Sequence, residues 1–254
     1  MFDERRKLIA CMLDIGKIML TCGGEISRIE DTLKRIGLSY GAKKVNAFAI
    51  ASMILVSIEF DDGEEITMTR RITKSFSNDF TKLEKLNALS RDFCTGNLSV
   101  DNLLEQFSKI SSSMPSKIIT YTGNALASGA FAMFFGGNIF DSILAALFGL
   151  FICFMQYKIT PLCRNNLTFI FLVSLVTGFG ISIISSPFSF IHPDKVIIGD
   201  IMLLIPGIAI TNSVRDIFVG DTISGSMRFI ECILCAAALA AGFMISILAT
   251  GGIL

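Results

Sequence analysis

The second half of the sequence contains five apolar runs, each about as long as a helix that crosses a membrane. Such a helix needs about 20 mostly apolar residues. Because backbone groups in lipid must pair within one segment, these runs predict membrane helices. The predicted helices cover residues 117–135, 139–157, 167–186, 196–214 and 227–249.

Charged side chains divide the chain into two parts of different character. Of the 44 charged residues, 33 lie in residues 1–117 and 11 in residues 118–254, although the net charge is zero. With 52% hydrophobic residues and a mean hydropathy of +0.65, the chain is too apolar for an ordinary soluble protein. We therefore expect a cytoplasmic α+β domain over residues 1–116 and an integral membrane α-helical bundle over residues 117–254. The expected surroundings are a lipid bilayer, with no nucleic-acid partner and no cofactor.

Basic residues in the short loops predict the orientation of the bundle, because cytoplasmic loops carry an excess of Lys and Arg. One side of the predicted bundle carries six such residues, and the opposite side carries only Lys195. The N-terminal domain is therefore expected in the cytoplasm, and Leu254 outside the cell membrane. The six basic residues are Lys109, Lys117, Lys158, Arg164, Arg215 and Arg228.

Hydrophobic periodicity predicts a small α+β fold for the N-terminal domain. Apolar residues recur every three or four positions in two segments, which indicates two helices that each bury one face. The period then changes to two and is followed by the turn signal Asp62-Gly63, which predicts a β-hairpin or small sheet. The predicted helices cover residues 8–19, 26–36, 78–93 and 100–110, the last with Ser99 as its cap.

Two motifs occur in a fixed order, one in each half of the chain. The first is GGEISRIEDTLKRIG at residues 23–37, followed by a β segment and by RRI at residues 70–72. The second is IPGxxxxNxxRDxxxGDxxSGxxR, which runs from Ile205 to Arg228. In this order and spacing the motifs resemble the threonine/serine exporter family. The resemblance covers nearly the whole chain and implies a membrane transporter that exports a small polar solute.

The resemblance also implies a partner and a range of solutes. Full-length members of that family carry a second helical bundle, so this chain resembles the split form, in which a second small membrane subunit supplies the remaining helices. The implied solutes are small amino acids such as threonine and serine, or dicarboxylates such as succinate. The sequence does not choose between them, and it leaves homo-oligomers open.

Asp200 is the clearest ionisable residue inside a predicted span. It lies four residues into the helix predicted at 196–214, about 6 Å from its outer end. A charge within a bilayer is costly, so such a group is a candidate for function, here to carry a proton or to hold a cationic group. The alternative is an interfacial acid that faces outer water beside Lys195.

Pro206 and Gly207 are predicted to break or loosen the same helix, because proline removes a backbone donor. Broken helices in transporters often expose backbone groups to a solute. Asn212 and Asp216 follow four residues apart, so they share one helix face. We expect them, with Asp221, to form the cytoplasmic entry to the substrate path.

Arg215 and Arg228 lie in the same stretch and could bind a solute carboxylate, while Asp216 could bind an ammonium group. The alternative for both arginines is to cap helices and anchor them at the membrane interface. A dicarboxylate would need mainly arginines and amide donors.

The first motif contributes Glu25, Arg28 and Glu30. Their expected role is structural, as helix-start charges that dock against the bundle or the partner subunit, with substrate contact as the alternative. His192 is interpreted as a plain loop residue, and Asp141 as an acid at a helix start that could equally line the exit. The seven cysteines have no disulfide-framework spacing and are interpreted as reduced thiols.

Other function classes fit the sequence less well. An intramembrane aspartyl protease needs two facing aspartates, but Asp200 and Asp221 are predicted on opposite sides of the membrane. The single histidine, His192, leaves no His-based triad for the N-terminal half, so the chain is not expected to be an enzyme. There is no P-loop for ATP, so coupling to an ion or proton is expected. A membrane-anchored sensor or scaffold is the alternative to a transporter.

Overall fold

The computed structural model describes residues 2–72, 79–160, 163 and 165–251, and these fall into two compact units. The N-terminal unit joins Met1–Met114 with Ile208–Phe229, and the membrane unit joins Pro115–Gly207 with Ile230–Leu254. Residues 208–229, which the sequence assigns to the membrane domain, thus pack with the N-terminal residues. The predicted helix start at residue 78, the basic loop residue Arg164 and the C-terminal Leu254 lie outside the described residues.

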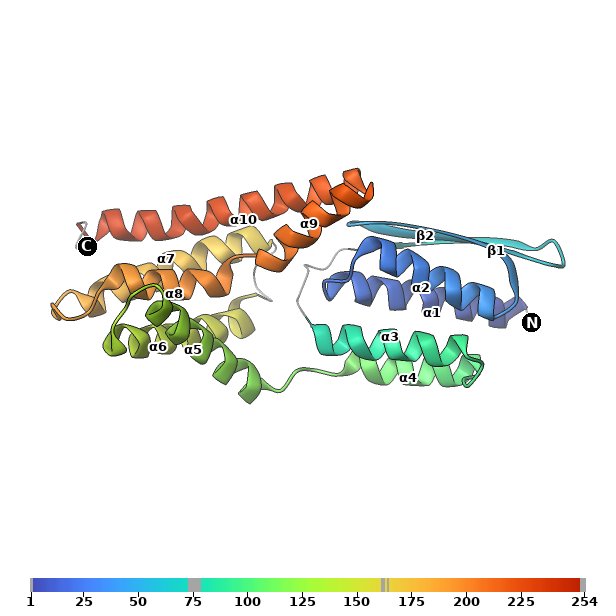
Figure 1. Ribbon diagram of the computed structural model, residues 1–254, viewed down its shortest axis with the longest axis horizontal. Helices are drawn as coiled ribbons and strands as arrows, with labels where there is room; N and C mark the ends of the chain where they lie inside the picture. Colours follow the sequence, from blue (N-terminus) through green and yellow to red (C-terminus); the bar gives the residue numbers. More distant parts are fainter. Residues whose placement is uncertain (1, 73–78, 161–162, 164, 252–254) are drawn as a thin grey trace. The chain divides into compact units, whose positions relative to one another are not determined.

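The N-terminal unit combines helices with a small antiparallel sheet, as the sequence predicts (Figure 1). The sheet has the strand order β1-β2-β3, and Asp62-Gly63 lies in the turn between β2 and β3. Gly63 has a φ of +81°, a conformation that favours glycine. The elements are α1 (Phe2–Thr21), α2 (Ile26–Ser39), β1 (Ala42–Ile50), β2 (Met53–Phe60), β3 (Glu65–Arg71), α3 (Phe80–Cys94) and α4 (Val100–Ser112).

The core of this unit lies between the sheet and its helices. The apolar face of α2 is fully buried, including Ile29 and Leu33. Alternate residues of β2 point the same way, so Ile54 and Val56 join this core. Helices α3 and α4 form a further layer against α1 (Figure 1). Ser99 caps α4 by accepting a hydrogen bond from the backbone N–H of Asn102, as predicted.

The membrane unit is a helical bundle with its own apolar core. Its helices are α5 (Lys117–Phe134), α6 (Ile139–Ile159), α7 (Asn166–Ser185), α8 (Pro193–Leu204) and the part of α10 (Thr222–Ala249) that follows Phe229. The predicted helix 196–214 is divided: α8 ends at Leu204, and α9 (Gly207–Val219) begins after Pro206. The predicted break is therefore confirmed, and it occurs because proline cannot donate the helical hydrogen bond.

Three of the described helices, α6, α7 and α10, are long and apolar enough to cross a membrane; α8 and α9, bent by 50° at their break, form either a broken fourth span or a re-entrant loop. The structure thus supports three or four spans by length and composition, where the sequence predicts five. Helix α5 lies where the first span was predicted, but Thr120, Thr122 and Asn124 dilute its apolar run. With three or four such spans, the chain is a multi-pass membrane protein.

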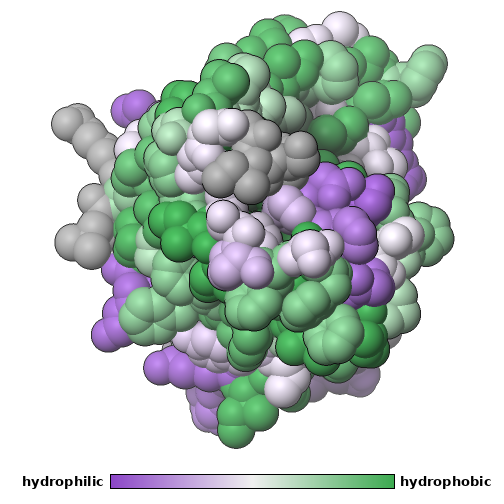
Figure 2. Space-filling view, turned by 90° about the vertical axis from the view of Figure 1, so that its left-hand side faces the viewer, coloured by the Kyte–Doolittle hydropathy of each residue, from purple (hydrophilic) through white to green (hydrophobic). Residues whose placement is uncertain are grey.

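Large apolar side chains face outward from the spanning helices, as expected for contact with lipid. Ile183 of α7 and Leu248 of α10 are examples, with 65% and 71% of their surface exposed. In the view of Figure 2, hydrophobic side chains cover most of the visible face. No disulfide joins any of the seven cysteines, all of which lie among the described residues.

Helices α5 and α6 pack closely at Gly129. A Cβ added there would lie 2.9 Å from the backbone oxygen of Ser142, which leaves no room for a methyl group. We expect Gly129→Ala to destabilise the purified chain by about 1–3 kcal/mol, because the helices would have to separate. Thermal unfolding in detergent measures this loss.

Gly123 on the same helix provides the control, because an added Cβ would meet no atom within 4 Å. Gly123→Ala should be neutral or slightly stabilising, since alanine favours helix more than glycine does. Equal melting temperatures for the two variants would contradict the close packing at Gly129.

Candidate functional site

A pocket of about 200 Å³ lies in the N-terminal unit, where α1 ends, α2 begins, and α3 and α9 approach them. Pockets for drug-sized ligands are larger, from about 300 Å³ upward, so this one suits a small molecule. Its lining combines charged and amide groups with apolar side chains. The polar side chains are Glu25, Arg28, Asn87 and Asn212, and the apolar ones include Met19, Ile29 and Leu83.

A glycine pair shapes the pocket. Gly23 has a φ of +91°, and the backbone N–H of Gly24 donates to the oxygen of Met19 at 2.9 Å. A Cβ on Gly24 would lie 2.7 Å from that same oxygen, so a side chain does not fit there. This turn reverses the chain and places Glu25 at the N-cap of α2. The side chain of Asn212 then donates to the backbone oxygen of Gly23 at 3.1 Å.

Glu25 and Arg215 connect the two sequence motifs. Arg215 Nη1 donates to Glu25 Oε1 at 2.5 Å, although the two residues are 190 positions apart. The second carboxylate oxygen, Glu25 Oε2, is buried and has no hydrogen-bond partner among the described residues. The Glu25 side chain does not cap the N-terminus of α2, because its carboxylate pairs with Arg215 instead. The ion pair with Arg215 thus holds the Glu25 carboxylate in place, and the second carboxylate oxygen, Oε2, accepts no hydrogen bond from the described residues.

Arg28 is exposed and lines the pocket. Its guanidinium makes no ion pair with any acid in the part of the chain that the structure describes. The pocket therefore holds a cationic group that is available to an anionic ligand.

Glu30 lies on α2 but performs a structural task. Its Oε1 accepts the backbone N–H of Ala49 at 2.7 Å, which ties α2 to the end of β1. Burial raises the pKa of Glu30 above its ordinary value of 4.5, and the Ala49 hydrogen bond only partly offsets this. The nearby charge of Asp221 raises the pKa further.

The raised pKa of Glu30 predicts a pH dependence of stability. The folded state holds the Glu30 proton more tightly than the unfolded state. The contribution of protonated Glu30 to folding stability is therefore present at low pH and is lost as pH rises through the folded pKa. Glu30→Gln removes the titration but keeps the acceptor oxygen. We expect its melting temperature, relative to the parent chain, to rise between about pH 4 and pH 7.

Glu105→Gln supplies the control, because Lys109 holds the pKa of the exposed Glu105 below its ordinary value. The melting temperature of Glu105→Gln relative to the parent chain should change little between about pH 4 and pH 7, and any change should be a fall. If the melting temperature of Glu30→Gln relative to the parent chain stays constant or falls between about pH 4 and pH 7, burial does not raise the pKa of Glu30.

The α9–α10 hairpin carries a buried ion pair. Arg228 Nη1 donates to Asp216 Oδ2 at 3.1 Å, and 6% and 4% of these two side chains are exposed. Gly225 allows the close approach, because a Cβ there would lie 2.7 Å from the backbone oxygen of Ser213. Asp221 lies in the connecting turn, where its backbone N–H donates to the oxygen of Asp216. The structure thus brings Asp216, Asp221 and Arg228 together.

Asp200 belongs to the membrane unit and is fully buried on α8. Its Oδ1 accepts a hydrogen bond from Ser128 Oγ on α5 at 2.5 Å, and its Oδ2 has no partner among the described residues. The glycine before it, Gly199, lets α8 approach the backbone of α5. The interfacial alternative does not fit, because Asp200 is not exposed and Lys195 pairs with Asp194.

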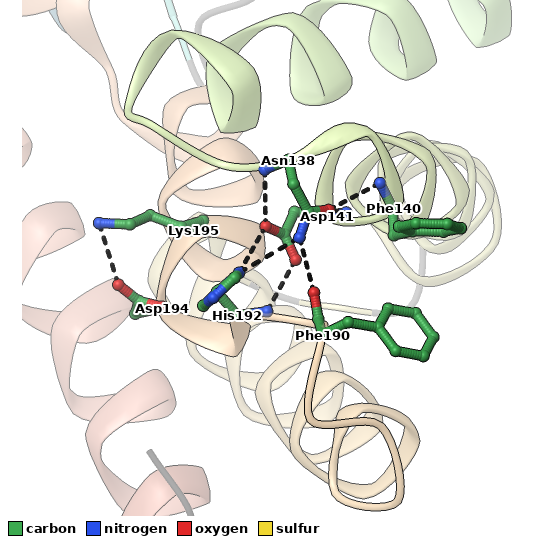
Figure 3. Close-up of polar contacts among 7 residues, drawn as sticks. All are labelled: Asn138, Phe140, Asp141, Phe190, His192, Asp194 and Lys195. Carbon is green, nitrogen blue, oxygen red and sulfur yellow. Dashed lines mark hydrogen bonds and ion pairs between the residues drawn. The ribbon is translucent and has the colours of Figure 1, made fainter.

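His192 corrects the sequence interpretation, whereas Asp141 lies at a helix start as expected (Figure 3). Asp141 is fully buried and completes a capping box with Asn138 at the start of α6. Its carboxylate also accepts the backbone N–H of His192 at 2.7 Å and lies 3.0 Å from the His192 ring. His192 is thus not a plain loop residue: it is the N-cap residue of α8 and is bonded to the start of α6.

Sequence reasoning missed Ser128 and Asn87. Ser128 lies in a helix rich in small residues, where a serine indicates packing, and it meets Asp200 across 72 positions of sequence. Asn87 lies on the amphipathic helix α3, and nothing in the sequence around it indicates a binding site.

The comparison with protein families agrees with the motifs and the helical membrane architecture. The family described as "Putative threonine/serine exporter" (ThrE) matches residues 10–249. No curated protein and no solved structure matches the chain in the corresponding searches. The match extends over both units and includes the pocket, the α9–α10 hairpin and Asp200. The chain therefore belongs to the threonine/serine exporter family, which implies a membrane exporter of threonine- or serine-like solutes.

Proposed function

We propose that this chain is one subunit of an exporter in the cell membrane, with α9 and the start of α2 forming the cytoplasmic entry for the solute. The excess of Lys and Arg in the predicted cytoplasmic loops supports this orientation, with the N-terminal unit in the cytoplasm and the C-terminus outside. A second small membrane subunit completes the path, as the resemblance to the split form of the family implies; the described helices supply three or four candidate spans. Homo-oligomers are a further arrangement that this proposal allows.

One observation carries the proposal. Residues of two motifs that are distant in sequence, Glu25 with Arg28 and Asn212, line one small pocket, and Arg215 of the second motif pairs with Glu25. Structural packing alone needs neither a charged lining nor an unused carboxylate oxygen. Both features suit the capture of a polar solute that carries a hydrogen-bond donor.

Asp200 supports the proposal of coupling to a proton. A fully buried carboxyl group with one serine donor and one unused oxygen can hold or release a proton, whereas a permanently charged group there would be costly. Proton entry through the membrane unit would then drive export.

Arg215→Gln tests the entry. The variant removes the ion pair with Glu25, and because the Arg215 side chain is 57% exposed, folding should be little affected. We expect export of labelled threonine or serine from cells to fall by about tenfold or more, with normal membrane abundance.

Arg35→Gln is the matched control, since Arg35 is 70% exposed and pairs with Asp31 on the same unit away from the pocket. It should export normally. Normal export by Arg215→Gln, at normal abundance, would remove the proposed entry.

A further inference from the structure

We propose that the pocket at the start of α2 is a receptor site for a zwitterion, in which Glu25 binds an ammonium group and Arg28 binds a carboxylate. This inference rests on the proposed export function and deepens it, because it assigns the site at which the solute is captured. It also separates the two solute classes that the sequence left open.

The Glu25 carboxylate defines one end of the ligand. Oε1 is occupied by Arg215, whereas Oε2 is buried and has no partner among the described residues. A buried carboxylate oxygen without a donor is unfavourable, and a ligand that supplies an N–H group removes this cost. An ammonium group has three such donors. A second carboxylate at this position would instead be repelled.

Arg28 defines the other end. Arg28 lines the same pocket, and its guanidinium makes no ion pair within the described part of the chain. Guanidinium groups bind carboxylates through paired, charge-assisted hydrogen bonds. The uncapped start of α2 adds backbone N–H groups, which also favour an anion. Arg28 lies three positions after Glu25, so both charges project from the first turn of the same helix.

The remaining lining fits a small side chain. Asn87 and Asn212 offer amide groups for a hydroxyl, and Met19, Ile29 and Leu83 offer an apolar wall for a methyl group. The volume of about 200 Å³ suits a small molecule such as a short amino acid. The pocket chemistry thus suits a short hydroxy amino acid better than a dicarboxylate.

Calorimetry on the purified full-length chain tests this assignment with ligands that differ in one group. The probes are L-threonine, 3-hydroxybutyrate, which lacks the ammonium group, threoninol, which lacks the carboxylate, and succinate. We expect L-threonine to bind more tightly than each of the other three by about tenfold or more.

Two variants connect the ligand groups to the residues. Glu25→Gln should weaken threonine and threoninol by about tenfold or more and leave 3-hydroxybutyrate unchanged. Arg28→Gln should weaken threonine and 3-hydroxybutyrate and leave threoninol unchanged. Glu105→Gln, an exposed acid on α4, is the control and should bind all four as the parent chain does.

Several results would overturn the assignment: no binding of threonine, equal binding of succinate and threonine, or variants that weaken all probes equally. Arg28 is exposed, so Arg28→Gln keeps the test valid even if Glu25→Gln does not fold. Efflux from cells is measured in parallel. Export of threonine without binding at this pocket refutes the receptor site alone, whereas absence of export refutes the proposed function.

Discussion

Asp216→Asn is expected to cause the largest loss of stability among single substitutions in the α9–α10 hairpin. The change keeps the size of the side chain but removes the charge that pairs with Arg228 at 3.1 Å. Both side chains are almost fully buried, so Arg228 would lose a compensating charge in a place where water cannot replace it. Losing one partner of a buried pair costs about 3–5 kcal/mol. Thermal unfolding of the purified chain and its abundance in the membrane measure the effect.

The double variant Asp216→Asn with Arg228→Gln separates charge from shape. Because neither position is then charged, it should recover much of the stability that the single variant loses. Asp31→Asn is the control: its pair with Arg35 is exposed, so the cost should be at most about 1 kcal/mol. A stable, abundant Asp216→Asn chain that fails to export would contradict the structural role and assign Asp216 to the solute or a coupling proton instead.

Asp200→Asn is expected to reduce export to the background of cells that lack the chain. Asparagine matches aspartate in size and can still accept the Ser128 hydrogen bond, but it cannot bind and release a proton. A neutral amide is also less costly than a carboxylate within a membrane, so the variant should reach normal abundance. Efflux of labelled threonine, measured with and without a proton gradient, tests this expectation.

Ser142→Ala is the matched control in the same unit. Ser142 Oγ donates to the backbone oxygen of Gly129, so its loss affects the contact between α5 and α6 but not a carboxyl group. It should lower stability slightly and keep the dependence of export on the gradient. If Asp200→Asn exports at the parent rate, Asp200 is not the coupling group.

Several features of the fold follow directly from local sequence. The spacing of Ile26, Ile29 and Leu33 predicts the buried face of α2, and Ser99 predicts the start of α4. The Asp62-Gly63 turn and Pro206 likewise predict the hairpin and the break between α8 and α9. Each signal acts over one or two turns of chain, where backbone geometry and hydrogen bonding depend on nearby residues alone.

The candidate residues were also visible in the sequence, but their partners were not. The motifs point to Glu25, Arg28 and Asn212, yet nothing local indicates that these three residues line one pocket. The sequence likewise gives no sign that Arg215 bonds to Glu25 across 190 positions.

In the membrane unit, too, the candidate residues are visible in the sequence but their partners are not. Asp200 stood out as an acid in an apolar run, but its burial against Ser128 depends on how α8 packs on α5. The sequence indicates separate roles for Asp141 and His192, although they bond across 51 positions. Sequence by itself determined the helices, the hairpin, the family and most candidate residues, because those follow from local periodicity and motif order. The tertiary structure decided which polar atoms meet and which are left without a partner, because these depend on packing between segments distant in sequence.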